Sequence, residues 1–167
     1  SDPSQVSRTV NFLNALLSAG CILFLFWSIT RLVRSLLKEE KENLSVTDVI
    51  IILGSGLVGA LAYTFSDTFW FSAVEGEVYA FSSFLTALVF WMILRWQDES
   101  DTVYGDRWII LIAYIIGLSI GVHLLNLLCI PAIVLVFYYQ KYRTISLKGA
   151  IAAIALSGLL IVLILFV

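Results

Sequence analysis

Uninterrupted apolar runs constrain this sequence more than any other feature. The longest covers residues 108–139, which is 32 positions without an aspartate, glutamate, lysine or arginine. A helix crosses the hydrocarbon core of a bilayer with about 20 such residues, and soluble domains are only about half apolar. This chain of 167 residues is 60% hydrophobic, with a mean hydropathy of +0.99. The sequence therefore predicts an all-α polytopic membrane protein.

Polar stretches divide the apolar sequence into segments of spanning length. As one helix, residues 108–139 would be roughly 48 Å long, which is too long for one crossing. We expect a break near residues 121–123 that leaves two short helices of roughly 22–24 Å each. The chain then has about six transmembrane helices in a single domain over residues 1–167. They are predicted near residues 6–34, 46–65 and 78–96, in the two halves of 108–139, and from 146 onward.

Local signals mark where several helices begin and end. Asp2 followed by Pro3 is typical of a helix start. Ser45 and Asp48 have the spacing of a capping box, which places the start of the second helix between them. The charged stretch at residues 34–43 is interpreted as a solvated linker that ends the first helix.

Packing signals lie inside two of the segments. The second segment has two pairs of small residues four apart, Ser55/Gly59 and Gly56/Ala60. Small residues at this spacing let two helices approach closely in lipid, so we expect a neighbouring helix there. Pro131 lies inside a predicted helix and is expected to kink it.

Lysine and arginine are distributed unevenly between the two ends of the predicted helices. Cytoplasmic loops are enriched in both residues. With six crossings and the first running inward, nine of the ten basic residues lie on the inner side. A single helix over residues 108–139 would change this division to six and four, so the charges favour the break. The outer side then holds Arg8, residues 67–79 and the turn at 121–126, and the inner side holds Arg31, Arg34, Lys38, Lys41, Arg95, Arg107, Lys141, Arg143 and Lys148.

Residues 67–79 form a predicted loop that carries most of the acid on the outer side. Its carboxylates are those of Asp67, Glu75 and Glu77. At a membrane surface such groups can act as general bases, bind a divalent metal or hold the hydroxyls of a sugar. A solvated loop without chemistry is the alternative. Trp70 and Tyr79 can stack on a sugar or a lipid, or belong to an interfacial aromatic belt.

Polar residues elsewhere on the outer side are further candidates. His123 and Asn126 are three apart, so on a helix they share a face. Because the two short helices would not reach bulk water, we expect this pair in a funnel at or below the outer surface. Polar groups at membrane depth suggest function, while helix capping and interhelical hydrogen bonding explain them as well. Arg8 can meet a phosphate or a lipid headgroup, and Asn11 and Asn14 are interpreted as interhelical hydrogen-bonding residues.

Other function classes are disfavoured by what the sequence lacks. No basic stripe interleaves with aromatic residues, which argues against nucleic acid as a partner. The sequence has no glycine-rich phosphate loop, no Ser-His-Asp constellation and no Cys/His metal cluster. Cys21 and Cys129 lie in apolar runs and are interpreted as small hydrophobic residues. Helix middles without charge disfavour an ion-coupled transporter.

Three stretches carry a resemblance to a known family. They are DPSQV at residues 2–6, DTFWFSAVEGEVYAFSSFLTALVFW at residues 67–91 and DRWIILIAYIIGLSIGVHLLN at residues 106–126. They resemble a bacterial membrane family catalogued as domain of unknown function 2723, and the likeness covers residues 1 to about 143. That family is related to an animal O-mannosyltransferase of the secretory pathway. Both are similar to the GT-C superfamily of membrane glycosyltransferases.

The resemblance implies an enzyme that transfers a sugar from a polyprenyl-phosphate carrier to a protein or glycan acceptor. It also implies location in a bacterial inner membrane, with residues 67–79 on the periplasmic side. On this reading Glu75, Glu77 and His123 are catalytic, and a divalent metal is a candidate cofactor. The predicted substrate-binding residues are Asp67, Trp70, Tyr79, Asn126 and Arg8.

The family's first helix, and the acid-bearing outer loop that follows it, have no counterpart in these residues. The resemblance therefore implies part of a GT-C-like transmembrane core, inactive as a fragment, with the catalytic base outside residues 1–167. Two alternatives stay open. One is a transporter or flippase of lipid-linked sugars, and the other is a helical membrane scaffold without catalysis.

Overall fold

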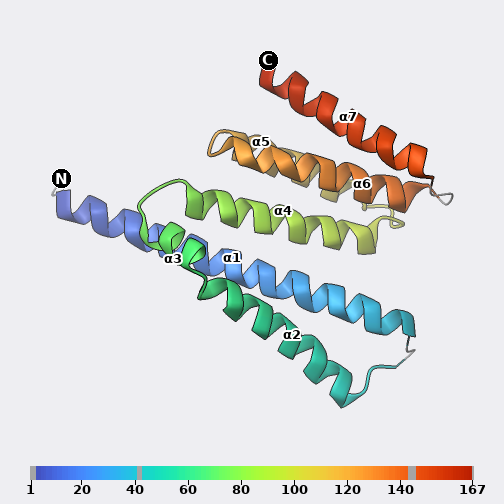
Figure 1. Cartoon of the computed structure of the whole chain (residues 1–167), viewed down its shortest axis with the longest axis horizontal. Helices are drawn as coiled ribbons and strands as arrows, with labels where there is room; N and C mark the ends of the chain where they lie inside the picture. The colour runs from blue at the N-terminus through green and yellow to red at the C-terminus, as the bar shows by residue number, and fades with distance from the viewer. Residues whose placement is uncertain (1–2, 41–42, 143–145, 167) are drawn as a thin grey trace. The chain divides into compact units, whose positions relative to one another are not determined.

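The computed structural model describes residues 3–40, 43–142 and 146–166. In these ranges the chain is helical and has no strand, which confirms the all-α prediction (Figure 1). Four of the described helices are long and apolar enough to cross a membrane, as expected of a polytopic membrane protein: Gln5–Leu37, Val46–Thr64, Tyr79–Glu99 and Leu147–Phe166. The chain forms two compact units, Ser1–Trp91 and Met92–Val167.

Helix α1 (Pro3–Glu40) is the longest element of the first unit, with 38 residues. At 1.5 Å per residue it is about 57 Å long, nearly twice the ~30 Å of a hydrocarbon core. The prediction of a linker from residue 34 is wrong as far as Glu40, because leucine, lysine and glutamate are good helix formers and nothing interrupts the helix there. Pro3 is the first helical residue, as predicted, and Asp2 lies outside the described residues.

Helix α2 (Val46–Thr64) begins at the predicted capping box. The Ser45 hydroxyl accepts a hydrogen bond from the Asp48 backbone N–H at 3.3 Å, and the Asp48 carboxylate accepts one from the Ser45 N–H at 2.8 Å. A capping residue of this type stabilises a helix by about 1 kcal/mol. Asp48 is buried, so the same bonds also satisfy a carboxylate that is shielded from water.

Small residues bring α1 and α2 close together, as predicted. A Cβ atom added at Gly56 would collide with Thr30 of α1, and one at Gly59 would lie 2.5 Å from the Ile29 side chain. Ala60, one turn after Gly56, is buried. Gly54, by contrast, has nothing within 4 Å of the position of an added Cβ. The face of α2 that contains Gly56 is therefore the one that packs on α1.

Residues 67–79 are not a continuous loop, and this prediction is wrong in part. Asp67–Val74 form a short helix, α3, of eight residues. Phe69 is buried, and its ring centroid lies 4.6 Å from that of Tyr63 at the end of α2. A helix this short is marginal in isolation, so packing of this aromatic pair, rather than a signal within the eight residues, stabilises it. Only residues 75–78 remain as a turn before α4 (Tyr79–Glu99).

The second unit contains the predicted break in the long apolar run. Helix α5 (Asp106–Ile120) ends, residues 121–123 turn, and a 3₁₀ helix, η1 (Leu124–Leu128), leads into α6 (Cys129–Lys141). In Figure 1 the chain turns back between α5 and α6. Gln140 near the end of α6 donates a hydrogen bond at 2.8 Å to the hydroxyl of Ser100, which lies just after α4. The end of α6 therefore returns to the end of α4, which confirms the hairpin.

The two helices of the hairpin are short. At 1.5 Å per residue, α5 is about 22 Å long and α6 about 20 Å, less than a typical hydrocarbon core. Pro131 is the third residue of α6. The first turn of a helix has no intrahelical acceptor for its N–H groups, so a proline there removes no hydrogen bond. Because α6 begins later than expected, Pro131 lies in its first turn rather than inside the helix, and the kink stays a prediction.

Helix α7 (Leu147–Phe166) packs on α6. The Tyr138 hydroxyl accepts a hydrogen bond at 3.2 Å from the backbone N–H of Ser146, just before α7 begins. Ala153 and Ser157, four apart, are the buried residues of α7. Of the six predicted crossings, four have helices of sufficient length, and the crossing of the membrane by α5 and α6 stays a prediction.

Candidate functional site

An acidic turn follows α3 and contains Glu75, Gly76 and Glu77. The Glu75 N–H donates to the carbonyl of Phe71 at 3.0 Å, which ends α3, and the Glu77 N–H donates to the carbonyl of Glu75 at 2.8 Å. All three residues of the turn are exposed. Gly76 therefore lies in a tight turn, and both carboxylates can reach a ligand in the surrounding medium.

The acidic turn lies against α1. Asn14 of α1 is buried, and its side-chain Nδ2 donates a hydrogen bond at 2.5 Å to the backbone carbonyl of Glu75. A Cβ atom added at Gly76 would lie 3.4 Å from Val10 and 3.9 Å from the Asn11 side-chain oxygen. Asn14 was predicted to bond to another helix. It bonds instead to the turn that carries the acids.

Asp67 is separated from the other two acids. It is the first residue of α3, and Glu75 is the residue at which α3 ends. Eight residues of helix place the two about 12 Å apart along the axis. Within the described ranges, no three or more His, Cys, Asp or Glu side chains are grouped so that they could hold a metal ion. We assign no step to a metal, and a divalent metal cofactor stays a prediction.

Aromatic residues border the acidic turn on both sides in the sequence. Trp70 and Phe71 of α3 are 56% and 65% exposed, and Tyr79 at the start of α4 is 45% exposed. These exposed rings are available to a lipid or to a sugar, so both predicted roles stay open. Arg8 is exposed on α1, two residues before Val10 at the turn.

His123 and Asn126 lie in the segment that joins α5 to α6. The His123 N–H donates to the carbonyl of Ser119 at 2.9 Å, and the His123 carbonyl accepts a hydrogen bond from the Asn126 N–H at 3.3 Å. His123 is half-buried and Asn126 is 3% exposed. The structure thus brings these two predicted residues together at the start of η1, because His123 directly precedes this 3₁₀ helix and Asn126 lies within it, whereas an α-helix had been assumed. Their proximity to the acidic turn stays a prediction.

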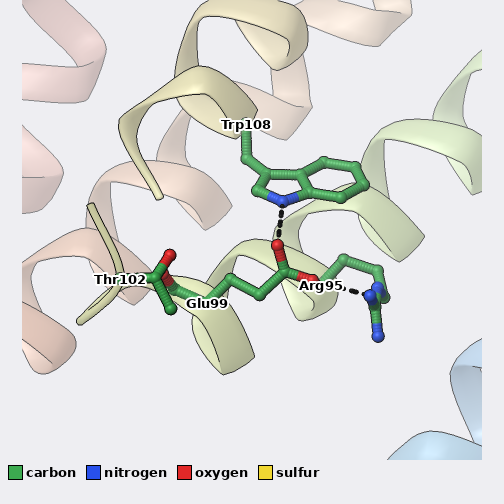
Figure 2. Close-up of polar contacts among 4 residues, drawn as sticks. All are labelled: Arg95, Glu99, Thr102 and Trp108. Carbon is green, nitrogen blue, oxygen red and sulfur yellow. Dashed lines mark hydrogen bonds and ion pairs between the residues drawn. The ribbon is translucent and has the colours of Figure 1, made fainter. Parts of the chain in front are cut away.

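A second polar cluster was not predicted from the sequence. Figure 2 shows the Glu99 carboxylate at the end of α4 between the indole of Trp108 and the guanidinium of Arg95. Trp108 Nε1 donates to Glu99 at 2.8 Å, and Arg95 forms an ion pair with Glu99 at 2.6 Å. The Thr102 hydroxyl donates to the Glu99 backbone carbonyl at 2.7 Å. The four-residue spacing of Arg95 and Glu99 is the one signal in the sequence that could have indicated this cluster.

The Glu99 cluster joins the end of α4 to the start of α5. A Cβ atom added at Gly105 would lie 2.5 Å from the Glu99 carbonyl oxygen, so a larger residue would push the connecting loop away. Arg107, in the first turn of α5, lies over the Tyr104 ring at 4.1 Å from its centroid. The polar groups of the cluster are directed at one another, which indicates a structural role rather than a binding site.

Fold and site together define an all-α polytopic membrane protein in which an acidic turn lies against the first long helix. The family model described as "Protein O-mannosyl-transferase TMEM260 N-terminal domain" matches residues 1–146. Because this match covers most of the chain, the chain belongs to that family. No curated protein matches the chain, and no solved structure does.

Proposed function

We propose that this chain is part of a membrane glycosyltransferase that moves a sugar from a polyprenyl-phosphate carrier to an extracytoplasmic acceptor. Membership of an O-mannosyl-transferase family supports this class of reaction. The observation that carries the site is the acidic turn, whose exposed Glu75 and Glu77 lie on a backbone that α1 holds in place. The same proposal includes a GT-C-like core and kinship with domain of unknown function 2723. It also includes location in a bacterial inner membrane, with the acidic turn on the periplasmic side.

The carboxylates of Glu75 and Glu77 are proposed to accept hydrogen bonds from hydroxyls of the sugar or of the acceptor. In the reaction the acceptor oxygen forms a bond to the anomeric carbon, and the bond from that carbon to the carrier phosphate breaks. The phosphate leaves with the electron pair, and the acceptor proton passes to a base. The resemblance to the GT-C enzymes assigns that base to an outer loop other than the acidic turn.

The remaining predicted residues are assigned to the two parts of the donor. Trp70 and Tyr79 offer exposed rings next to the turn, and stacking on a sugar face is the contact that such rings provide. Asp67 can accept a further sugar hydroxyl. His123, Asn126 and Arg8 are proposed to contact the carrier phosphate, for which a cation and N–H donors are suitable ligands.

Conservative substitutions in the complete protein that contains this chain test the site. Glu75→Gln and Glu77→Gln should each lower the rate of transfer about tenfold to a hundredfold, because a hydrogen bond to a charged group contributes about 1.5–3 kcal/mol. His123→Ala should lower it similarly. Transfer of radiolabelled sugar from a polyprenyl-phosphate donor in isolated membranes measures the effect, after normalisation to the amount of folded protein.

Asp101→Asn is the matched control, because it makes the same change of charge at an exposed acid in the loop after α4. It should leave transfer unchanged. Normal transfer in all three site variants would end the assignment of these residues. If the labelled sugar changes sides of the membrane without reaching an acceptor, the protein is a flippase and not a transferase.

A further inference from the structure

Helix α1 has several polar side chains on its buried side, and their surroundings differ. Ser18 and Ser28 are buried, and among the described residues neither hydroxyl has a hydrogen-bond partner. The Cys21 thiol lies 3.4 Å from the carbonyl of Ser83 in α4. Asn14 differs from these residues because its amide bonds directly to a predicted site residue, Glu75, 61 residues later in the chain.

The bond from Asn14 constrains the backbone between the two glutamates. A carbonyl oxygen has two lone pairs, and that of Glu75 accepts both the Asn14 amide and the Glu77 N–H. Because this carbonyl belongs to the planar peptide unit that joins Glu75 to Gly76, fixing its direction fixes that plane. Glu75 is attached directly to this plane, and Glu77 is linked to it by the hydrogen bond from its N–H to the same carbonyl.

Gly76 permits this arrangement by its size. The position of an added Cβ lies at ordinary contact distance, 3.4 Å, from Val10. Val10 and Asn14 are four residues apart, so they lie on one face of α1. The turn therefore contacts α1 both through a hydrogen bond and through direct packing.

We propose that Asn14 is a positioning residue of the acidic turn, whose amide sets the direction in which the Glu75 and Glu77 carboxylates point. This inference rests on the proposed function of those carboxylates. In a general packing role, by contrast, loss of the amide would lower the yield of folded protein. It would leave the conformation of the acidic turn and the catalytic rate of the folded protein unchanged.

Hydrogen exchange provides the first test, in the complete purified protein in detergent. Asn14→Leu keeps a side chain of similar size but has no donor. It should speed exchange in peptides that contain the Glu77 amide about fivefold, the factor that corresponds to ~1 kcal/mol for one net hydrogen bond. Asn14→Gln retains the donor and should restore most of the protection. Ser18→Ala, which removes a buried hydroxyl one turn along α1, should change nothing.

Transfer kinetics provide the second test on the same variants. Per folded molecule, Asn14→Leu should lower kcat more than it raises KM, because misdirected carboxylates affect the reacting complex more than the binding of the long lipid donor. Asn14→Gln should recover most of kcat. Asn14→Ala repeats the test with a smaller side chain if the leucine variant does not fold.

The outcomes separate this inference from the proposed function. If Glu75→Gln lowers transfer while Asn14→Leu and Asn14→Ala change neither exchange nor kcat, the positioning role is wrong and the proposed function stands. A second outcome is that the asparagine variants speed exchange while Glu75→Gln and Glu77→Gln transfer sugar normally. Asn14 then does order the turn, but the proposed function of the turn is wrong, and the catalytic part of this inference is wrong as well.

Discussion

Glu99 accepts hydrogen bonds from residues on both sides of the loop between α4 and α5. Its ion pair with Arg95 is partly exposed, with 40% and 36% of the two side chains accessible. An exposed pair four residues apart on a helix contributes only about 0.3–0.5 kcal/mol. The bond from Trp108 joins two helices and has a charged acceptor, for which about 1.5–3 kcal/mol is typical. The two partners of Glu99 should therefore differ in importance.

Trp108→Phe should lower the midpoint of thermal unfolding more than Arg95→Leu does. The phenylalanine ring keeps much of the apolar contact but has no N–H to donate to Glu99. Thermal aggregation of each purified variant in the same detergent reports its unfolding and gives both midpoints under one condition. Equal shifts, or a larger shift for Arg95→Leu, would show that the ion pair and not the indole bond holds the loop.

Individual contacts could be predicted from the sequence only where their partners are close together in the chain. Ser45 and Asp48 are three residues apart, and their capping box is present as predicted. Asn14 and the acidic turn are 61 residues apart, and no spacing rule relates residues so distant. The polar character of Asn14 within an apolar helix predicted that it makes a hydrogen bond, but not with which partner.

Helices α1 and α2 pack through Gly56, so a side chain at that position should separate them. Gly56→Leu places a branched side chain where even a Cβ collides with Thr30. Overpacking of this kind costs about 1–3 kcal/mol, and we expect a lower unfolding midpoint and less folded protein. Gly54→Leu is the matched control, because nothing lies within 4 Å of its added Cβ and leucine is the better helix former.

The fluorescence-detected elution profile of each glycine variant from size-exclusion chromatography measures the folded yield. A Gly56→Leu variant as abundant and as stable as Gly54→Leu would mean that α1 and α2 do not pack at this position.

Whole helices were predicted better than the segments between them. The break at residues 121–123 could be predicted because the apolar run exceeds the thickness of a bilayer, and the structure contains it. Helix α3 could not, because the burial of Phe69 against Tyr63 stabilises it, and eight residues give no clear periodicity. The extension of α1 to Glu40 was missed because charged residues suggested a linker, although those residues are also good helix formers.

The topology of the whole chain can be tested by the accessibility of single cysteines. In a background with Cys21 and Cys129 replaced by alanine, cysteines at Val78 and Gly121 should react with a membrane-impermeant maleimide added to intact cells. A cysteine at Val103, which is 93% exposed, should react only after the membrane is permeabilised. Mass-tagged maleimides and gel shifts measure the labelling.

Tyr142 provides the control for this experiment. It follows the end of α6, which bonds to the loop that contains Val103, so cysteines at these two positions must label from the same side. If Val78 and Gly121 label from opposite sides, the acidic turn and His123 cannot share a site. The fold class and the hairpin were thus predictable from apolar length and charge, whereas the proximity of the acidic turn to His123 stays a prediction, because neither property determines long-range packing.

The length of α1 has a further consequence for access to the acidic turn. The turn contacts α1 near Val10 and Asn14, whereas the helix begins at Pro3. Seven residues of helix, about 10 Å, therefore precede Val10 at the N-terminal end of α1, which is the blue end of this helix in Figure 1. A molecule that moves toward Glu75 or Glu77 along α1 from its N-terminal end therefore passes about two turns of helix before it reaches the acidic turn.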